Sequence, residues 1–219
     1  MTGPQNPLLA EEQDGLLILT INRPHVRNAI DGATAERMAA ELERFDADDT
    51  LSVAIITGAG GGFSSGMDLG AFVQGSKPSV PVRGFAGVTR KSANKPLIAA
   101  VEGYAIAGGL EIAIACDLIV AASDAKFAIP EVRRGLVAAA GALLRLPRRI
   151  PYHVVMEMAL TGEAVPADRL YGFGLINRLV EPGSALAEAT RLARAIMQGG
   201  PLAIAATKQI LVEQQDLTL

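Results

Sequence analysis

Alternating apolar and polar segments divide the chain into short strands and amphipathic helices. Four strands are predicted where an apolar run meets a Gly, Pro, Asn or Asp boundary, at residues 15–21, 51–57, 96–101 and 118–121. Shorter extended pieces follow at 126–129 and 175–180. Because the longer runs are almost continuously apolar, we expect them to form a sheet that is covered on both faces.

Helical spacing is clearest at residues 31–46, where apolar residues recur on one face and Asp31 is suited to cap the N-terminus. Further helices are expected to begin near Asp68, at Gly108 or Gly109, and at residue 201, the last of them running to 215. Strands that alternate with helices predict an α/β fold.

Two other regions have a less regular pattern. From residue 138 onward the chain is mainly helical, with breaks at Pro147, Pro151, Pro166 and Pro182. Residues 74–88 are rich in Gly, Ser, Pro and Val and show no period, which predicts a mobile surface loop.

The apolar stretch at 97–122 is long enough to cross a membrane as a helix. It contains Glu102, Glu111 and Asp117 as well as glycines, and ionised side chains are costly in a bilayer. We therefore interpret the stretch as a buried strand, a glycine turn and a buried helix, and expect no membrane association.

Composition narrows the class of protein further. The chain has 219 residues, of which 50% are hydrophobic, so it can bury a large core. A net charge of −3 and an aromatic content of 4% argue against nucleic-acid binding. Cys116 is the only cysteine and no secretory signal is evident at the N-terminus, which favours a reducing, cytoplasmic location.

The sequence GFSSGMDL at 62–69 fits the pattern G-x-S-x-G, which exposes a nucleophilic serine in one class of hydrolases. A serine hydrolase that uses Ser64 would need a histidine base held by an acid. His153 with Asp117 or Glu131 satisfies the required order along the chain. A serine hydrolase is therefore one remote alternative hypothesis for the function.

A second glycine stretch suggests different chemistry. Residues 102–117 predict a strand end, a turn and a glycine pair that opens a helix. The first N–H groups of a helix have no internal partner, so the amide of Gly108 could bind an oxyanion. The 62–69 stretch ends in the same way near Met67, and two such amides facing one point would hold a developing negative charge.

Two acids lie near these turns in the sequence. Glu111 follows Gly108 by one helical turn, and Glu131 follows Pro130 after an extended piece. Each can be explained alone as an acid that favours a helix N-terminus. Together with the two glycine turns they suggest a paired acid and base.

Five stretches, in order, resemble motifs of the enoyl-CoA hydratase/isomerase (crotonase) superfamily, and the chain is most like a bacterial enoyl-CoA hydratase. They are NRP with RNA at 22–29, FSSGMDL at 63–69, the segment 103–117, IPE at 129–131, and PLAIAATK at 201–208. The resemblance covers the chain from residue 14. It implies a fold of repeated ββα units that form two near-perpendicular sheets surrounded by helices, and assembly as a homotrimer or a hexamer (dimer of trimers).

The resemblance also implies the chemistry. The backbone N–H groups of Met67 and Gly108 would hold the thioester oxygen of an acyl-CoA, and Glu111 and Glu131 would hold one water between them for hydration of a trans-2-enoyl-CoA to a 3-hydroxyacyl-CoA. The further substrate-binding positions that it implies are Val26, Asn28, Ala29, Ser65, Gly66, Asp68, Leu69, Ile106, Gly109 and Pro130. Acyl-CoA is a substrate in this scheme, so no cofactor and no metal are expected.

Two alternatives to hydration remain within the family. One is isomerisation of enoyl-CoA, and the other is acyl-CoA binding with little catalysis. The run VAAAGA at 137–142 departs from the glycine-rich run common in hydratases, which affects the expected shape of the acyl pocket.

We expect a core domain at 1–200 and the start of a C-terminal helical region at 201–219, apparently truncated relative to the family. A basic cluster is interpreted as a solvated helix end or, alternatively, as a CoA phosphate contact; it comprises Arg145, Arg148 and Arg149.

Overall fold

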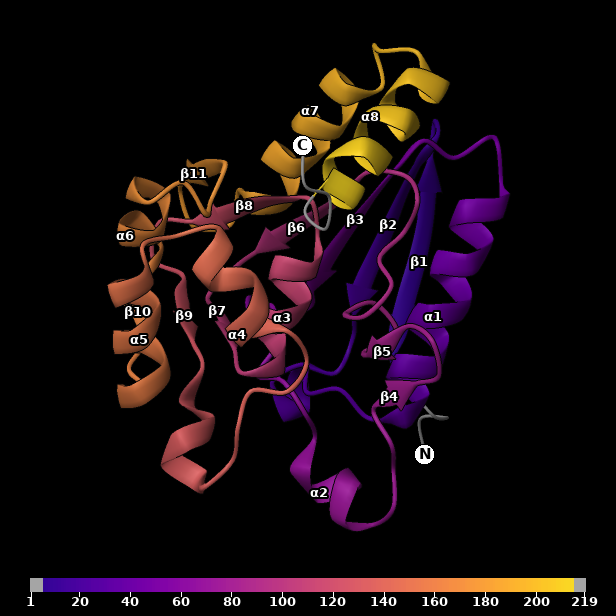
Figure 1. The fold of residues 1–219 in the computed structure, drawn as a ribbon. Coiled ribbons are helices and arrows are strands. Elements are labelled where there is room, and N and C mark those ends of the chain that lie inside the picture. The colour runs from indigo at the N-terminus through magenta and orange to yellow at the C-terminus, as the bar shows by residue number, and fades with distance from the viewer. Residues whose placement is uncertain (1–5, 215–219) are drawn as a thin grey trace.

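The computed structural model describes residues 6–214, and Figure 1 shows their arrangement. The main feature is a six-stranded sheet with the spatial order β1-β2-β3-β6-β8-β11. Its strands are β1 Leu8–Gln13, β2 Leu16–Ile21, β3 Val53–Gly58, β6 Leu97–Val101, β8 Leu118–Ala122 and β11 Arg178–Val180. The strands pair in parallel except for β1 and β2, which form an antiparallel hairpin.

Two smaller sheets accompany the main one. In the three-stranded sheet, the strand β9 lies between β7 and β10; the bounds are β7 Tyr104–Ile106, β9 Lys126–Ala128 and β10 Val165–Pro166. A two-stranded ribbon consists of β4 Ser79–Val80 and β5 Gly84–Phe85.

Helices cover these sheets (Figure 1). The α-helices are α1 Gly32–Ala47, α2 Leu69–Val73, α3 Gly108–Ala115, α4 Ala142–Arg145, α5 Tyr152–Thr161, α6 Ala167–Gly172, α7 Ala185–Ile196 and α8 Pro201–Glu213. Short 3₁₀ helices are η1 Pro24–Val26, η2 Pro130–Arg134 and η3 Leu146–Arg148. The orders β1-β2-α1, β6-β7-α3 and β8-β9-η2 repeat a ββα unit, so the predicted α/β crotonase-like fold is confirmed.

Both faces of the main sheet are covered, as the apolar strands predicted. Ala54 and Ile56 of β3 belong to the larger core cluster, whereas Val53 and Ile55 face a second cluster with α7. The helix α7 contributes Ala185, Ala189 and Ala193 to that second cluster. Small residues on this face of α7 let the helix lie close to the sheet.

The stretch 97–122 is divided among β6, β7, α3 and β8, which confirms the strand, turn and helix interpretation. The turn after residue 103 also contains the short strand β7. Within residues 6–214, no helix is both long enough and apolar enough to cross a membrane.

Two sequence-based expectations about local structure were wrong. β1 was not predicted, because it is an edge strand whose second half is exposed and polar. The segment 74–88 is not simply a surface loop: Ala86 and Val88 are buried, and Arg83 is only 2% exposed. Arg83 is held by Asp46 of α1 at 3.3 Å, which ties the β4–β5 ribbon to that helix.

Candidate active site

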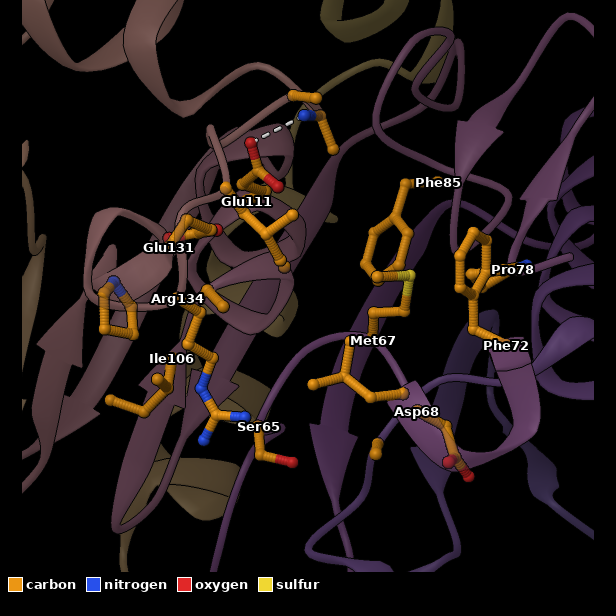
Figure 2. Close-up of a pocket in the computed structure, with 18 of the residues that line it drawn as sticks. Ser65, Met67, Asp68, Phe72, Pro78, Phe85, Ile106, Glu111, Glu131 and Arg134 are labelled. Atoms are coloured by element: carbon orange, nitrogen blue, oxygen red, sulfur yellow. Dashed lines mark hydrogen bonds between the residues drawn. The ribbon is translucent and has the colours of Figure 1, made fainter. Parts of the chain in front are cut away.

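A cavity of about 810 Å³ opens where α2, the β4–β5 ribbon, α3 and η2 meet. Figure 2 shows Glu111 and Glu131 on one side of it, with Met67, Phe85 and Phe72 on the other. Most of the predicted site residues line this cavity: Val26, Ala29, Ser65, Met67, Asp68, Leu69, Ile106, Gly108, Glu111, Pro130 and Glu131. The structure therefore brings together residues that are far apart in the sequence.

The amides of Met67 and Gly108 both lie in this lining. Within residues 6–214, neither backbone N–H donates a hydrogen bond to another backbone or side-chain group. Met67 follows Gly66, and a methyl group on Gly66 would come within 2.8 Å of the Gly108 nitrogen. The two turns that carry these amides therefore meet at a glycine, and both turns border the cavity.

Strand pairing fixes the relative position of the two turns. Ser64 forms a parallel bridge with Ala105 of β7, and the N–H of Ile106 donates to the Ser64 carbonyl at 3.0 Å. Next along the chain, Ala107 has a φ of +53° and caps α3. A positive φ is unusual for alanine and is a form of strain often found at functional sites. Here it turns the chain from β7 into α3 directly before Gly108.

Three predicted substrate-binding residues lie behind the cavity wall and are absent from its lining: Asn28, Gly66 and Gly109. The buried Asn28 side chain donates to the carbonyls of Ala59 and Gly62, at 2.8 and 2.7 Å, and so fixes the glycine-rich turn at 58–62. At Gly109, a Cβ atom would lie 2.1 Å from the Ser64 carbonyl oxygen. In the structure these residues hold the two turns together.

Asp68 has a structural role at the cavity rim. Its carboxylate accepts a hydrogen bond from the Ala71 N–H at 3.0 Å and so caps α2. It also forms an ion pair with Arg23 at 3.0 Å, and Arg23 pairs with Asp31, the cap of α1, at the same distance. The Ala71 hydrogen bond and the Arg23 charge lower the pKa of Asp68, which keeps it ionised.

Glu111 is 3% exposed and points into the cavity from the first turn of α3. Its Oε1 accepts hydrogen bonds from the N–H groups of Ala140 at 2.7 Å and Ala142 at 3.1 Å. Burial raises the pKa of Glu111, and the two amides and the charge of Arg145 act in the opposite direction. These contacts specifically stabilise the carboxylate form.

Glu131 lies in η2, and its environment is different. Its Oε2 is buried and has no hydrogen-bond partner among residues 6–214. Burial is the main cause that raises the pKa of Glu131, and the charge of Glu111 raises it further. A hydrogen bond from its own backbone N–H acts in the opposite direction, and burial together with the neighbouring negative charge favours the protonated form of Glu131.

The serine-hydrolase alternative is wrong. Ser64 is fully buried and does not line the cavity. Its Oγ donates to the Asn28 carbonyl at 2.8 Å and accepts from the Gly66 N–H at 3.1 Å, so the hydroxyl stabilises the turn. His153 lies on α5 and packs edge-on against Tyr152, without a hydrogen bond to Ser64.

Several cavity residues were missed in the sequence. Phe85 lies against the start of α3, since a methyl group on Gly108 would come within 2.5 Å of its ring. Phe72 and Lys77 also line the cavity. Phe85 and Lys77 fall in the segment without periodicity, which gave no signal of a wall residue. Of the two arginines that follow Glu131, Arg134 lines the cavity, whereas Arg133 pairs with Glu163 at 3.6 Å.

Fold and cavity together define a protein that places two carboxylates and two unpaired backbone amides around one small-molecule site. Comparison with known proteins identifies the family. The family model described as enoyl-CoA hydratase/isomerase matches residues 11–219. This chain belongs to the enoyl-CoA hydratase/isomerase (crotonase) family, so the resemblance seen in its motifs is confirmed.

Individual relatives agree with this assignment. The chain is 43% identical over 208 residues to a carnitinyl-CoA dehydratase from Salmonella arizonae, a match that covers 93% of this chain and 79% of that protein. It resembles the crystal structure of enoyl-CoA hydratase EchA1 from Mycobacterium marinum with a TM-score of 0.96 and 53% identity, over 98% of this chain and 85% of that one. A carnitinyl-CoA dehydratase structure from Mycobacterium avium matches with a TM-score of 0.91 and 41% identity, over 94% and 82%.

Proposed function

We propose that this protein catalyses the hydration of trans-2-enoyl-CoA thioesters to 3-hydroxyacyl-CoA, and the reverse elimination of water. The observation that carries the proposal is the presence of Glu111, Glu131 and two unpaired amides, those of Met67 and Gly108, in one cavity. Relatives named enoyl-CoA hydratase and carnitinyl-CoA dehydratase support it, because both names describe the addition or removal of water at an acyl-CoA.

In this scheme the thioester oxygen accepts hydrogen bonds from the N–H groups of Met67 and Gly108. When water adds to the β-carbon, negative charge moves onto that oxygen as the thioester becomes an enolate. Donors placed in advance lower the energy of this state, and one such donor typically contributes about 3 kcal/mol to the barrier reduction. The enolate collapses when a proton reaches the α-carbon.

The two glutamates divide the proton transfers. Glu111, whose carboxylate form is stabilised by two amides, removes a proton from water as its oxygen attacks the β-carbon. Glu131, whose buried Oε2 has no donor, supplies the proton that the α-carbon takes up. The hydroxyl group of the water ends on the β-carbon and its proton on Glu111, while the proton from Glu131 ends on the α-carbon. The two glutamates together therefore hold one proton before and after the reaction. The roles exchange in the reverse direction.

The remaining lining residues fit an acyl-CoA. Arg27, Lys77 and Arg134 place positive charge along the cavity, which would favour the phosphates of CoA. Phe72, Phe85 and Met67 form an apolar wall for the acyl chain. The scheme requires no cofactor. Assembly as a homotrimer or hexamer and a cytoplasmic location stay predictions of this proposal.

Isomerisation of enoyl-CoA is the second candidate, since one glutamate can move a proton between two carbons of an enolate.

A test presents trans-2-enoyl-CoA and trans-3-enoyl-CoA thioesters of several chain lengths to the protein. Hydration is followed by loss of absorbance of the conjugated thioester and by mass spectrometry of the hydrated product. The proposal predicts a gain of one water from the trans-2 substrates. Conversion of the trans-3 substrates alone would indicate an isomerase, and binding without turnover would indicate an acyl-CoA binder.

A further inference from the structure

A second cavity, of about 650 Å³, adjoins the candidate active site. The two cavities share four wall residues, Ser79, Phe85, Ala139 and Ala140. Four arginines line the second cavity: Arg90, Arg145, Arg148 and Arg149. We call it the arginine cavity. Its lining among residues 6–214 contains no acidic side chain.

The four arginines of this cavity form no ion pair within the described chain. Arginines elsewhere, such as Arg23, Arg83 and Arg169, form ion pairs with carboxylates. Four cations around one hollow create a positive potential, which favours binding of an anion.

Two of the arginines are held in place by backbone carbonyls. Arg145 donates to the carbonyls of Ala140 and Thr89, and Arg149 donates to that of Ile114. Burial lowers the pKa of both, and the charge of Arg145 lowers the pKa of Arg149 further. The more distant carboxylates of Glu111 and Asp117 act in the opposite direction on Arg145 and Arg149, respectively. A bound anion would offset this repulsion, because a guanidinium and a carboxylate carry opposite charges and can form a bidentate pair.

The position of the arginine cavity indicates which anion it receives. Ala140 lies between the two sites: its N–H donates to Glu111, and its carbonyl accepts from Arg145. An acyl chain whose reacting carbons lie at Glu111 would therefore meet the arginines if it continued past this residue. Phe85, which faces both cavities, lies at the boundary between them.

We propose that the arginine cavity binds a carboxylate at the far end of the acyl chain, so that the preferred substrates are CoA thioesters of dicarboxylic acids. This proposal rests on the proposed acyl-CoA function for the placement of the thioester. It differs from a contact with CoA phosphates, because the discriminating group lies on the acyl chain. A chain that ends in a quaternary ammonium, as carnitinyl-CoA does, would be repelled by the same arginines.

Binding of saturated ligands tests the proposal without requiring turnover. Calorimetry compares glutaryl-, adipoyl- and suberoyl-CoA with valeryl-, hexanoyl- and octanoyl-CoA, which match them in length but end in a methyl group. We expect at least one dicarboxylic thioester to bind about tenfold or more tightly than its partner. Equal affinity within every pair would overturn the proposal.

The variant for this test is the double substitution Arg90→Gln with Arg148→Gln. Both residues are exposed at the cavity, and neither side chain makes a hydrogen bond or ion pair within residues 6–214, so folding should be retained. The preference for the carboxylate should fall several-fold or more, while affinity for the methyl-ended ligands stays constant. Arg191→Gln on the exposed face of α7 is the matched control and should keep the preference.

Other outcomes separate the competing explanations. If both ligand types lose affinity equally in the double variant, the arginines bind CoA phosphates and the proposal is wrong. If the variant changes only the oligomeric state measured by sedimentation, the arginines serve a contact between copies, and the proposal is also wrong. A carboxylate preference in a protein that hydrates no enoyl-CoA would keep this inference and contradict the proposed hydration instead.

Discussion

The backbone N–H of Ala140 donates a hydrogen bond to Glu111 Oε1 at 2.7 Å. This contact joins α3 to the 137–142 run, whose sequence departs from the run expected of hydratases. The run therefore holds the carboxylate that we assign as the base, in addition to forming the cavity wall. Its backbone, more than its side chains, determines the state of Glu111.

Replacement of Ala140 by proline removes this donor. The carboxylate form of Glu111 then loses one stabilising hydrogen bond, so its pKa rises and a higher pH is needed to ionise it. In Ala140→Pro we expect kcat near neutral pH to fall about tenfold or more and the acidic limb of the pH–rate profile to move to higher pH. Ala140→Gly keeps the N–H and should keep the profile; an unshifted profile in the proline variant would contradict the role of this amide.

The access of an oxygen to the Gly108 amide depends on Gly66. In Gly66→Ala the new methyl would lie 2.8 Å from the Gly108 nitrogen, so one donor is lost. We expect kcat to fall by about 10²–10³-fold. Gly75→Ala is a matched control, because Gly75 has nearly the same φ, +93° against +92°, with no atom within 4 Å of the added Cβ. If both variants lose activity equally, backbone strain and not the amide is responsible.

Glu131 should reduce the stability of the folded protein at neutral and alkaline pH. Burial raises its folded pKa above the ordinary value of 4.5, so its contribution to stability is present below about that pH and is lost as the pH rises through the folded pKa. Glu131→Gln should therefore raise Tm relative to wild type at about pH 8 by at least about 2 °C, with a smaller gain at about pH 5.

A control for this stability effect is Glu36→Gln, on the exposed side of α1. Its Tm should follow that of wild type at both pH values. A lower Tm for Glu131→Gln at about pH 8 would show that the buried Oε2 is satisfied in solution, which would contradict the environment described for this acid.

Ser64 should prove to be structural. Ser64→Ala removes two hydrogen bonds of a buried hydroxyl and should lower the free energy of unfolding by about 1–3 kcal/mol, measured in urea. Turnover of the folded variant should stay within about tenfold of wild type, because the hydroxyl only supports the turn before Met67. Labelling of wild-type Ser64 by a serine-directed fluorophosphonate would contradict this role.

Much of the secondary structure was predicted correctly from short stretches of the sequence. The apolar strands and the start of α3 near Gly108 follow from residues close together in the chain, whereas the meeting of Glu111 and Glu131 in one cavity was implied by the family resemblance. The polar edge strand β1 was missed because only one of its six residues is fully buried, so it carries little apolar signal.

Long-range contacts could not be predicted in the same way. The bond between Ala140 and Glu111 spans 29 residues, and nothing in either segment indicates the partner. Phe85 lies in the β4–β5 ribbon and Arg90 follows it, and the ribbon is tied to α1 by the distant pair Arg83 and Asp46. The cluster interpreted as a solvated helix end similarly became part of a cavity only through tertiary packing. The division into a core at 1–200 and a C-terminal region at 201–219 stays a prediction.

In the proposed mechanism Glu111 and Glu131 act together on one water. The most direct measurement is the rate of hydration of a short trans-2-enoyl-CoA by wild type, Glu111→Gln and Glu131→Gln, alongside the binding of a saturated acyl-CoA to each. Each variant should lose about a hundredfold or more in kcat, while the saturated ligand binds within a few-fold of wild type. An unchanged rate in either variant, or wild-type protein that hydrates no enoyl-CoA of any chain length, would contradict it.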